Sequence, residues 1–120
     1  MNFLLIFLGG GLGSVCRYAI SVMMTRGSSP LPWATLLVNV LGCLFIGLFA
    51  QGLARDSVWR WLFMAGFCGG FTTFSTLSLE CWTLWQAQQF GWLALYVAAS
   101  LVLGLAAVAG GFVLGRILFF

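Results

Sequence analysis

Polar side chains at regular spacing inside long apolar segments are the residues of this sequence that could do chemistry. Between residues 32 and 54, a small or polar residue recurs at every fourth position, which in a helix places the set on one face. These residues are Thr35, Asn39, Cys43, Gly47 and Gln51. Asn39 lies too deep in its apolar segment to reach water easily, and such a group normally faces a cavity or a partner. Its amide either bonds a neighbouring helix or donates into a pore, and the pattern leaves both open.

The stretch from residue 66 to 80 has the least ordinary composition for an apolar segment. Gly66, Gly69 and Gly70 precede a run rich in Ser and Thr, which is poor material for an unbroken helix. A break inside a membrane leaves main-chain groups unpaired, and broken membrane helices place their carbonyls on cations and their N–H groups on anions. The sequence therefore predicts a central cation site made from carbonyls. The alternative is a kinked but continuous helix whose Ser and Thr side chains bond back to their own carbonyls.

Three further polar residues stand out in the first and last apolar segments. Arg17 shares a helical face with small residues, namely Gly10, Gly13, Ser14 and Ser21. It is either an arginine that snorkels from near a helix end or a charge that attracts anions. Tyr96 and Ser100 are four residues apart, which places two hydroxyl donors on one face of the last segment.

The composition predicts the elements that position these residues. Of the 120 residues, 62% are hydrophobic and 6% charged, whereas a soluble domain carries roughly 25% charged residues. The chain therefore needs lipid around it, and a helix that spans the bilayer needs about 20 apolar residues. We predict helices at about 2–25, 32–54, 59–86 and 92–119, within a single transmembrane domain that covers 1–120. The short connections require neighbouring helices to be antiparallel.

The charged residues exclude two classes of function. A net charge of +3 is spread thinly over five arginines, so there is no cluster that could neutralise the phosphates of a nucleic acid. The chain has no histidine, no carboxylate pair and no evident base partner for a cysteine. We therefore do not expect an enzyme.

The arginines give almost no preference for one orientation in the membrane. Arg55, Arg60 and Arg116 fall on one side of the predicted bundle. Arg26 and the helix end that carries Arg17 fall on the other side. Orientation follows the bias of Lys and Arg near helix ends, so a chain with so little bias can insert both ways. A modest real bias is the alternative.

Three motifs in order along the chain resemble those of the Fluc or CrcB family of bacterial fluoride channels. The first consists of Gly9, Gly10, Gly13, Arg17 and Tyr18, the second covers residues 35 to 42, and the third covers residues 66 to 76. The resemblance extends over essentially the whole chain. It implies a multi-pass protein of the bacterial inner membrane that exports fluoride passively. It also implies an antiparallel, dual-topology homodimer with two pores.

The resemblance also assigns roles to individual residues. A structural sodium ion at the dimer centre would be held by the main-chain carbonyls of Gly69 and Thr72. The residues that would line the fluoride pore are Asn39, Phe74, Ser75, Thr76, Leu77, Tyr96 and Ser100. Arg17 matches a vestibule charge, and Glu80 matches the acid of the third helix. The family usually has a second pore Phe where this chain has Leu77, which has no ring edge to offer an anion, so either one ring per pore suffices or conduction differs.

Two other classes of membrane protein remain as alternatives to a channel. A proton-coupled small multidrug transporter is also a four-helix dual-topology dimer, but the mechanism of such transporters needs a Glu in the first helix. Here Glu80 in the third helix is the only candidate acid. A non-conducting membrane assembly subunit is the third class. For the channel, the expected partners are fluoride, a second copy of the chain and the lipid bilayer, without nucleic acid.

Overall fold

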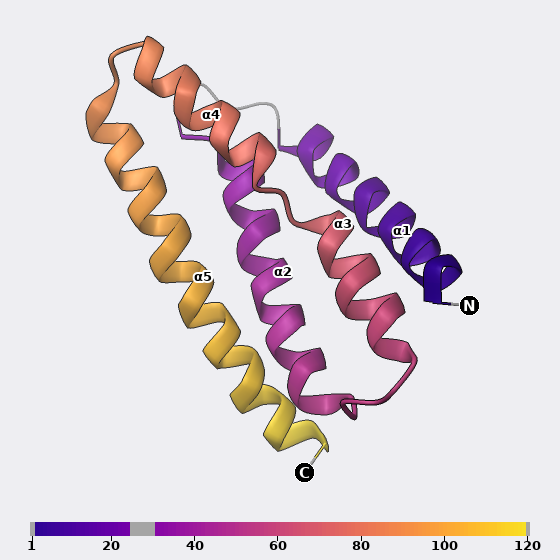
Figure 1. Cartoon of the computed structure of the whole chain (residues 1–120). Helices are drawn as coiled ribbons and strands as arrows, with labels where there is room; N and C mark the ends of the chain where they lie inside the picture. The colour runs from indigo at the N-terminus through magenta and orange to yellow at the C-terminus, as the bar shows by residue number, and fades with distance from the viewer. Residues whose placement is uncertain (1, 25–30, 120) are drawn as a thin grey trace.

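The four apolar stretches form long helices in the computed structural model, which describes residues 2–24 and 31–119 (Figure 1). The elements in chain order are α1 (Asn2–Met23), α2 (Trp33–Gly52), the π-helix η1 (Trp61–Cys68), α3 (Gly69–Phe71), α4 (Ser75–Gln86) and α5 (Phe90–Phe119). Four spans in these residues are long and apolar enough to cross a membrane, with η1, α3 and α4 together making the third. The predicted set of four spans is confirmed, although residue 25 of the first predicted helix lies outside the described residues.

The third span is interrupted between α3 and α4, at residues 72–74. Thr72 leaves the helix with an extended backbone (φ −82°, ψ 160°), and its N–H and its hydroxyl both donate to the carbonyl of Cys68, at 3.0 and 2.8 Å. Thr73 precedes the next helix by two residues, and its Oγ1 accepts the N–H of Thr76 in the first turn of α4 at 3.2 Å. The two threonine side chains thus bond main-chain groups on the two sides of the interruption.

The interruption lets the two halves of the third span pack against different helices. Its first half, η1 and α3, packs against α1, whereas its second half, α4, packs against α5. Figure 1 shows the chain crossing from the side of α1 to the side of α5 at this point. Helix α2 packs along α5 and also contacts η1, so it lies beside the break.

Glycines bring the backbones of packed helices into direct contact, as small residues do in membrane bundles. A Cβ on Gly9 of α1 would lie 2.8 Å from the main-chain nitrogen of Phe67 in η1. A Cβ on Gly47 of α2 would lie 3.1 Å from the carbonyl carbon of Val108 in α5. The pairs α1–η1 and α2–α5 therefore leave no room for a side chain at these points.

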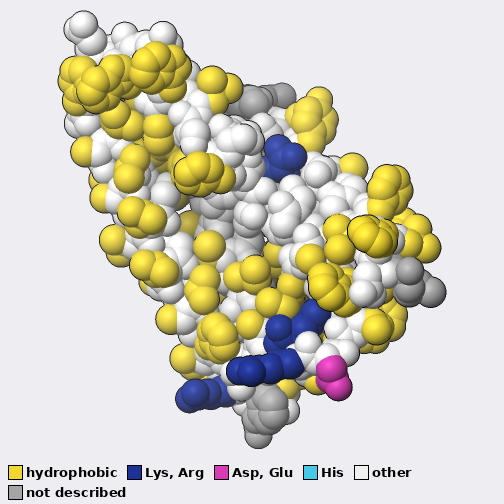
Figure 2. All heavy atoms as spheres, viewed as in Figure 1, with side chains coloured by type: hydrophobic (Ala, Val, Ile, Leu, Met, Phe, Trp, Pro, Cys, Tyr) yellow, Lys and Arg dark blue, Asp and Glu magenta, His cyan; other side chains and the backbone are white. Residues whose placement is uncertain are grey.

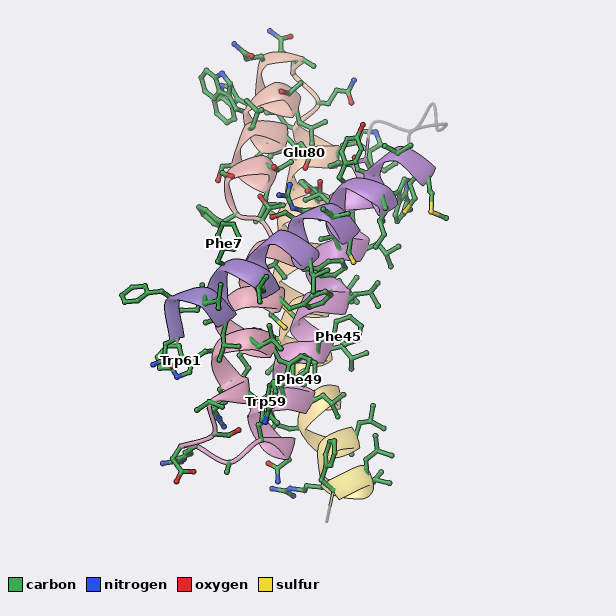
Figure 3. All side chains as sticks on the ribbon, turned by 90° about the vertical axis from the view of Figure 1, so that its right-hand side faces the viewer. Phe7, Phe45, Phe49, Trp59, Trp61 and Glu80 are labelled. Carbon is green, nitrogen blue, oxygen red and sulfur yellow. The ribbon has the colours of Figure 1, made fainter. Side chains whose placement is uncertain are left out.

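An aromatic row runs along α2 and η1 toward the break. Phe45 contacts the rings of Phe49, Phe67 and Phe71, with centroids 6.3–6.4 Å apart. Phe71, the residue before the break, is only 3% exposed. Phe45 and Phe49 lie along α2 in Figure 3. Phe71, the last residue of α3, therefore packs against the rings of this row.

The outer surface of the described bundle is largely apolar (Figure 2). Dark blue arginine side chains gather at the end of the molecule where the C-terminus lies. At that end, Arg60 donates to three carbonyls at the end of α2, those of Ala50, Leu53 and Ala54, at 2.9–3.1 Å. A cation there pairs with helix carbonyls that have no intrahelical partner. Arg60 therefore joins the second loop to α2.

Candidate functional site

A polar cavity of about 210 Å³ lies on the α1 side of the break. Its lining comes from α1, α2 and the break, and consists of Ser14, Arg17, Tyr18, Ser21, Ala34, Thr35, Val38, Thr73 and Thr76. One guanidinium and several hydroxyls thus face a common space between these elements. A polar cavity of this kind suits a hydrated or partly hydrated anion.

A larger, mostly apolar groove of about 690 Å³ lies on the other side of the break. Six of the residues assigned by resemblance line it, namely Asn39, Gly69, Thr72, Phe74, Leu77 and Ser100. Thr73 lines both the groove and the polar cavity. The break is therefore the wall that the two hollows share.

Asn39 of α2 bonds the break through both polar atoms of its amide. Its Nδ2 donates to the carbonyl of Thr73 at 3.1 Å, and its Oδ1 accepts the N–H of Thr73 at 2.9 Å. The amide thus bonds the interruption of the third span, which corresponds most closely to the first of the two roles considered for Asn39, a bond to a neighbouring helix. An amide nitrogen carries two hydrogens, so one N–H remains beyond this pair, on a residue that also lines the groove.

Arg17 of α1 reaches the break from the opposite side. Its Nε donates to the carbonyl of Gly70 at 3.2 Å, although the two residues are 53 positions apart in the sequence. The half-buried side chain also lines the polar cavity. It is therefore directed into the protein, to the last turn of α3.

The main-chain carbonyls at the break fall into two kinds. Those of Gly70 and Thr73 accept side-chain donors from Arg17 and Asn39. Within residues 2–24 and 31–119, no donor reaches the carbonyl of Gly69, Phe71 or Thr72. Of these three residues, Gly69 and Thr72 line the groove. The described residues hold no cluster of three His, Cys, Asp or Glu side chains that could hold a metal ion.

A buried hydrogen bond joins α5 to α4 near the break. Tyr96 is fully buried, and its hydroxyl donates to Oε1 of Glu80 at 3.0 Å. Figure 3 places Glu80 on the second half of the third span. Ser100, one turn beyond Tyr96, lines the groove, and its buried hydroxyl has no hydrogen-bond partner in the described part of the chain. A buried hydroxyl without a partner is rare in native proteins and marks a place for a ligand or water.

The remaining residues assigned by resemblance differ in their surroundings. Phe74 is 79% exposed, so its ring extends away from the described bundle. Leu77 packs against the buried cluster that includes Tyr96 and Leu84, and it also lines the groove. Ser75 is exposed, and its hydroxyl lies 3.4 Å from that of Thr73. Neither Ser75 nor Tyr96 lines either of the two hollows.

Thr35 is a polar residue of this site to which the resemblance assigned no role. It is 8% exposed and lines the polar cavity together with Arg17. The four-residue spacing on α2 marked Thr35 as a member of the small and polar face but did not indicate what it contacts.

The comparisons with known proteins agree with this architecture. Residues 4–112 match the protein family described as "CrcB-like protein, Camphor Resistance (CrcB)". The chain is 44% identical to the "Fluoride-specific ion channel FluC" of Agrobacterium fabrum, over 99% of each chain. It is 42% identical to the proteins of the same name from Azobacteroides pseudotrichonymphae, over 92% of each chain, and from Bacteroides fragilis strain YCH46, over 92% of this chain and 93% of the relative. Similarity over the full set of spans shows that the chain belongs to the CrcB family.

Proposed function

We propose that this chain is a fluoride-selective channel that lets fluoride leave a bacterial cell passively through the inner membrane. The observation that carries the proposal is the full-length similarity to relatives named fluoride-specific ion channels. The two hollows that meet at the break provide a polar entrance and an apolar passage between the packed spans. A channel of this kind carries out no enzymatic reaction.

The chemistry of the groove suits a small and strongly hydrated anion. A dry passage must replace water with several weak donors, none of them strong enough to trap the ion. Donors of this type are the second N–H of the Asn39 amide and the hydroxyl of Ser100, both without a partner among the described residues, and the ring edge of Phe74. Thr76 adds a hydroxyl on the cavity side of the break. Because Leu77 lines the groove without a ring edge, Phe74 is the aromatic ring that we expect to contact the ion.

The functional unit we propose is an antiparallel homodimer in which a second copy covers the groove. Phe74 is mostly exposed beside an open apolar groove of about 690 Å³, and a partner surface would enclose both. The nearly balanced arginines allow insertion in both orientations. Two pores would then lie at or beside the interface between the two copies.

A sodium ion at the dimer centre fits the residues at the break. The carbonyls of Gly69 and Thr72 have no donor in the described part of the chain, and both residues line the groove that a second copy would close. Carbonyl oxygens are ligands for hard cations, and two residues from each copy would give four of them. The ion would supply a positive charge that offsets these unpaired carbonyls.

The transporter alternative finds less support than the channel. Helix α1 contains no acid, and Glu80 already accepts the hydroxyl of the buried Tyr96. The names of the relatives also favour a channel over a transporter and over a non-conducting assembly subunit.

Fluoride efflux from loaded proteoliposomes, measured with a fluoride electrode, tests the proposed function. We expect fast fluoride release, little release of chloride under the same gradient, and loss of fluoride release in Phe74→Ile. The substitution Leu105→Ile, at a residue 72% exposed on α5 and absent from both hollows, is the control. If correctly folded protein releases no fluoride, the channel proposal is wrong and the assembly subunit becomes the better hypothesis.

A further inference from the structure

The carbonyl of Gly70 occupies an unusual position, because it belongs to the last turn of α3 and cannot bond within a continuing helix. The N–H that would normally reach a carbonyl here belongs to Phe74, beyond the extended Thr72. Inside a bilayer such a carbonyl is costly if it stays unpaired. The Nε–H of Arg17 supplies the missing donor at 3.2 Å.

The surrounding contacts restrict where this donor can be. Helix α1 touches α3 so closely that a Cβ on Gly70 would lie 2.9 Å from the Cα of Gly10. A Cβ on Gly13, one turn before Arg17, would lie 2.7 Å from the main-chain nitrogen of Phe71. The backbones on both sides of the bond are therefore held together, and the guanidinium reaches Gly70 over a short path along this contact.

From this geometry we infer that Arg17 is a positioning residue of the break, acting through its Nε–H bond to Gly70 rather than through its charge alone. In the described residues, the carbonyl of Gly70 lies among carbonyls that have no donor, that of Gly69 before it and those of Phe71 and Thr72 after it. Because the peptide unit is planar, the bond to Gly70 also orients the N–H of Phe71. Together with Asn39 at Thr73, Arg17 holds the break from two sides, one on α1 and one on α2.

This inference deepens the fluoride conduction proposed above and rests on it. A charge in the polar cavity would act at long range by raising the local concentration of anions, and dissolved salt would screen that effect. A hydrogen bond to a main-chain carbonyl acts at contact, and added salt leaves it largely unchanged. The two roles can therefore be separated by experiment.

Two substitutions of Arg17 divide the donor from the charge. In Arg17→Gln, the side-chain amide nitrogen follows the same carbon atoms as the arginine Nε, so a donor remains at that place without the charge. In Arg17→Lys the charge remains, but a methylene group stands where the Nε–H was. Arg55→Gln removes an exposed arginine of the second loop and is the control for lost charge.

Initial fluoride efflux from proteoliposomes at low and at high ionic strength is the first measurement. We expect Arg17→Gln to stay within about twofold of the unsubstituted protein and Arg17→Lys to fall by about tenfold, the effect of losing one partly buried hydrogen bond. For each variant, the ratio of its efflux rate to that of the unsubstituted protein should be the same at the two ionic strengths. A conducting Lys variant with a failing Gln variant would overturn the inference, and so would equal rates in both variants.

Thermal unfolding of the same proteins in detergent provides a readout that does not depend on conduction. We expect the unfolding temperature of the Gln variant to exceed that of the Lys variant, because only the former keeps the bond to Gly70. The reverse order would overturn the inference even if the unsubstituted protein failed to conduct. If neither variant folds, solid-state NMR of the unsubstituted protein labelled with 15N-Arg and 13C-Gly tests the inference instead. A missing contact between Arg17 Nε and the Gly70 carbonyl would contradict the inference.

Discussion

Asn39 and Thr73 hydrogen-bond each other twice, across 34 positions of sequence. The amide of Asn39 donates to the carbonyl of Thr73 at 3.1 Å and accepts its N–H at 2.9 Å. One side chain thereby satisfies both main-chain groups of a residue that no helix can satisfy, because residue 73 lies between α3 and α4. The pair also fixes which way the amide is turned, so the remaining N–H has a defined direction.

The substitution Asn39→Asp should damage both stability and conduction. A carboxylate can accept the N–H of Thr73 but cannot donate to its carbonyl, so two acceptors would face each other. We expect the free energy of unfolding to fall by about 1–3 kcal/mol and fluoride efflux to be lost. Unfolding in detergent and efflux from proteoliposomes measure the two effects.

The control for this substitution is Leu37→Ala on the same helix. Leu37 is 39% exposed and lines neither hollow, so its truncation should leave efflux unchanged. An Asn39→Asp protein that is as stable and as conductive as the unsubstituted chain would show that the reciprocal pair is not needed.

The spans of this fold could be predicted from sequence because lipid imposes a simple length and composition on them. The predicted range 32–54 corresponds to Trp33–Gly52, and 92–119 corresponds to Phe90–Phe119. The stretch that contains the break was also predictable, since Gly, Ser and Thr weaken a helix locally. The π-helix η1 was not predicted, because π-helices are rare and the apolar run of Trp61–Cys68 is equally typical of an α-helix.

The contacts of the site were less predictable than its residues. The helical spacing marked Asn39 and Arg17 as polar residues that need a partner. It could not name Thr73 or Gly70, because these partners lie 34 and 53 positions away and are brought near only by packing. These contacts also decide which carbonyls near the break have a donor, so that distinction too required the structure.

The pair Tyr96 and Glu80 gives a prediction that separates a hydrogen bond from a charge. Tyr96→Phe removes the only hydroxyl that donates to Glu80 among the described residues. We expect a loss of about 1–2 kcal/mol in the free energy of unfolding, together with slower fluoride efflux. Glu80→Gln keeps an oxygen that can accept the same hydroxyl, so its loss should be smaller, under about 1 kcal/mol. Equal losses in the two variants would contradict this account of the pair.

Adjacent glycines of α1 provide a matched test of how closely α1 and η1 pack. A Cβ on Gly9 would lie 2.8 Å from the nitrogen of Phe67, and a main-chain atom cannot move aside easily. Gly9→Ala should therefore lower the free energy of unfolding by about 1–3 kcal/mol. A Cβ on Gly10 would meet its nearest atom, the carbonyl oxygen of Gly66, at an ordinary 3.8 Å.

Gly10→Ala should accordingly leave stability unchanged or raise it by up to about 1 kcal/mol, because alanine favours a helix more than glycine does. Chemical unfolding of both variants in the same detergent makes the comparison. Should the two substitutions prove equally harmful, the direct contact of α1 with η1 would not be what distinguishes these glycines.

Gly69 provides a test of the proposed dimer that leaves the single protomer intact. Gly69 is exposed and lines the groove, and within its own protomer a Cβ there would meet only the carbonyl oxygen of Met64, at 4.0 Å. A larger side chain therefore has room until a second copy covers the groove. We expect Gly69→Leu to raise the dimer dissociation constant about tenfold or more, the effect of a strained contact of roughly 1–3 kcal/mol. Helix content measured by circular dichroism should remain unchanged.

Energy transfer between labelled copies, diluted stepwise in lipid vesicles, measures the dissociation constant of the dimer. The control is Gly91→Leu at the start of α5, where a Cβ meets no atom within 4 Å and the residue lines neither hollow. A Gly69→Leu protein that dimerises as tightly as the Gly91→Leu control would place the interface elsewhere. It would also remove the support for a cation bound between the carbonyls of two breaks, because those carbonyls could then not face each other.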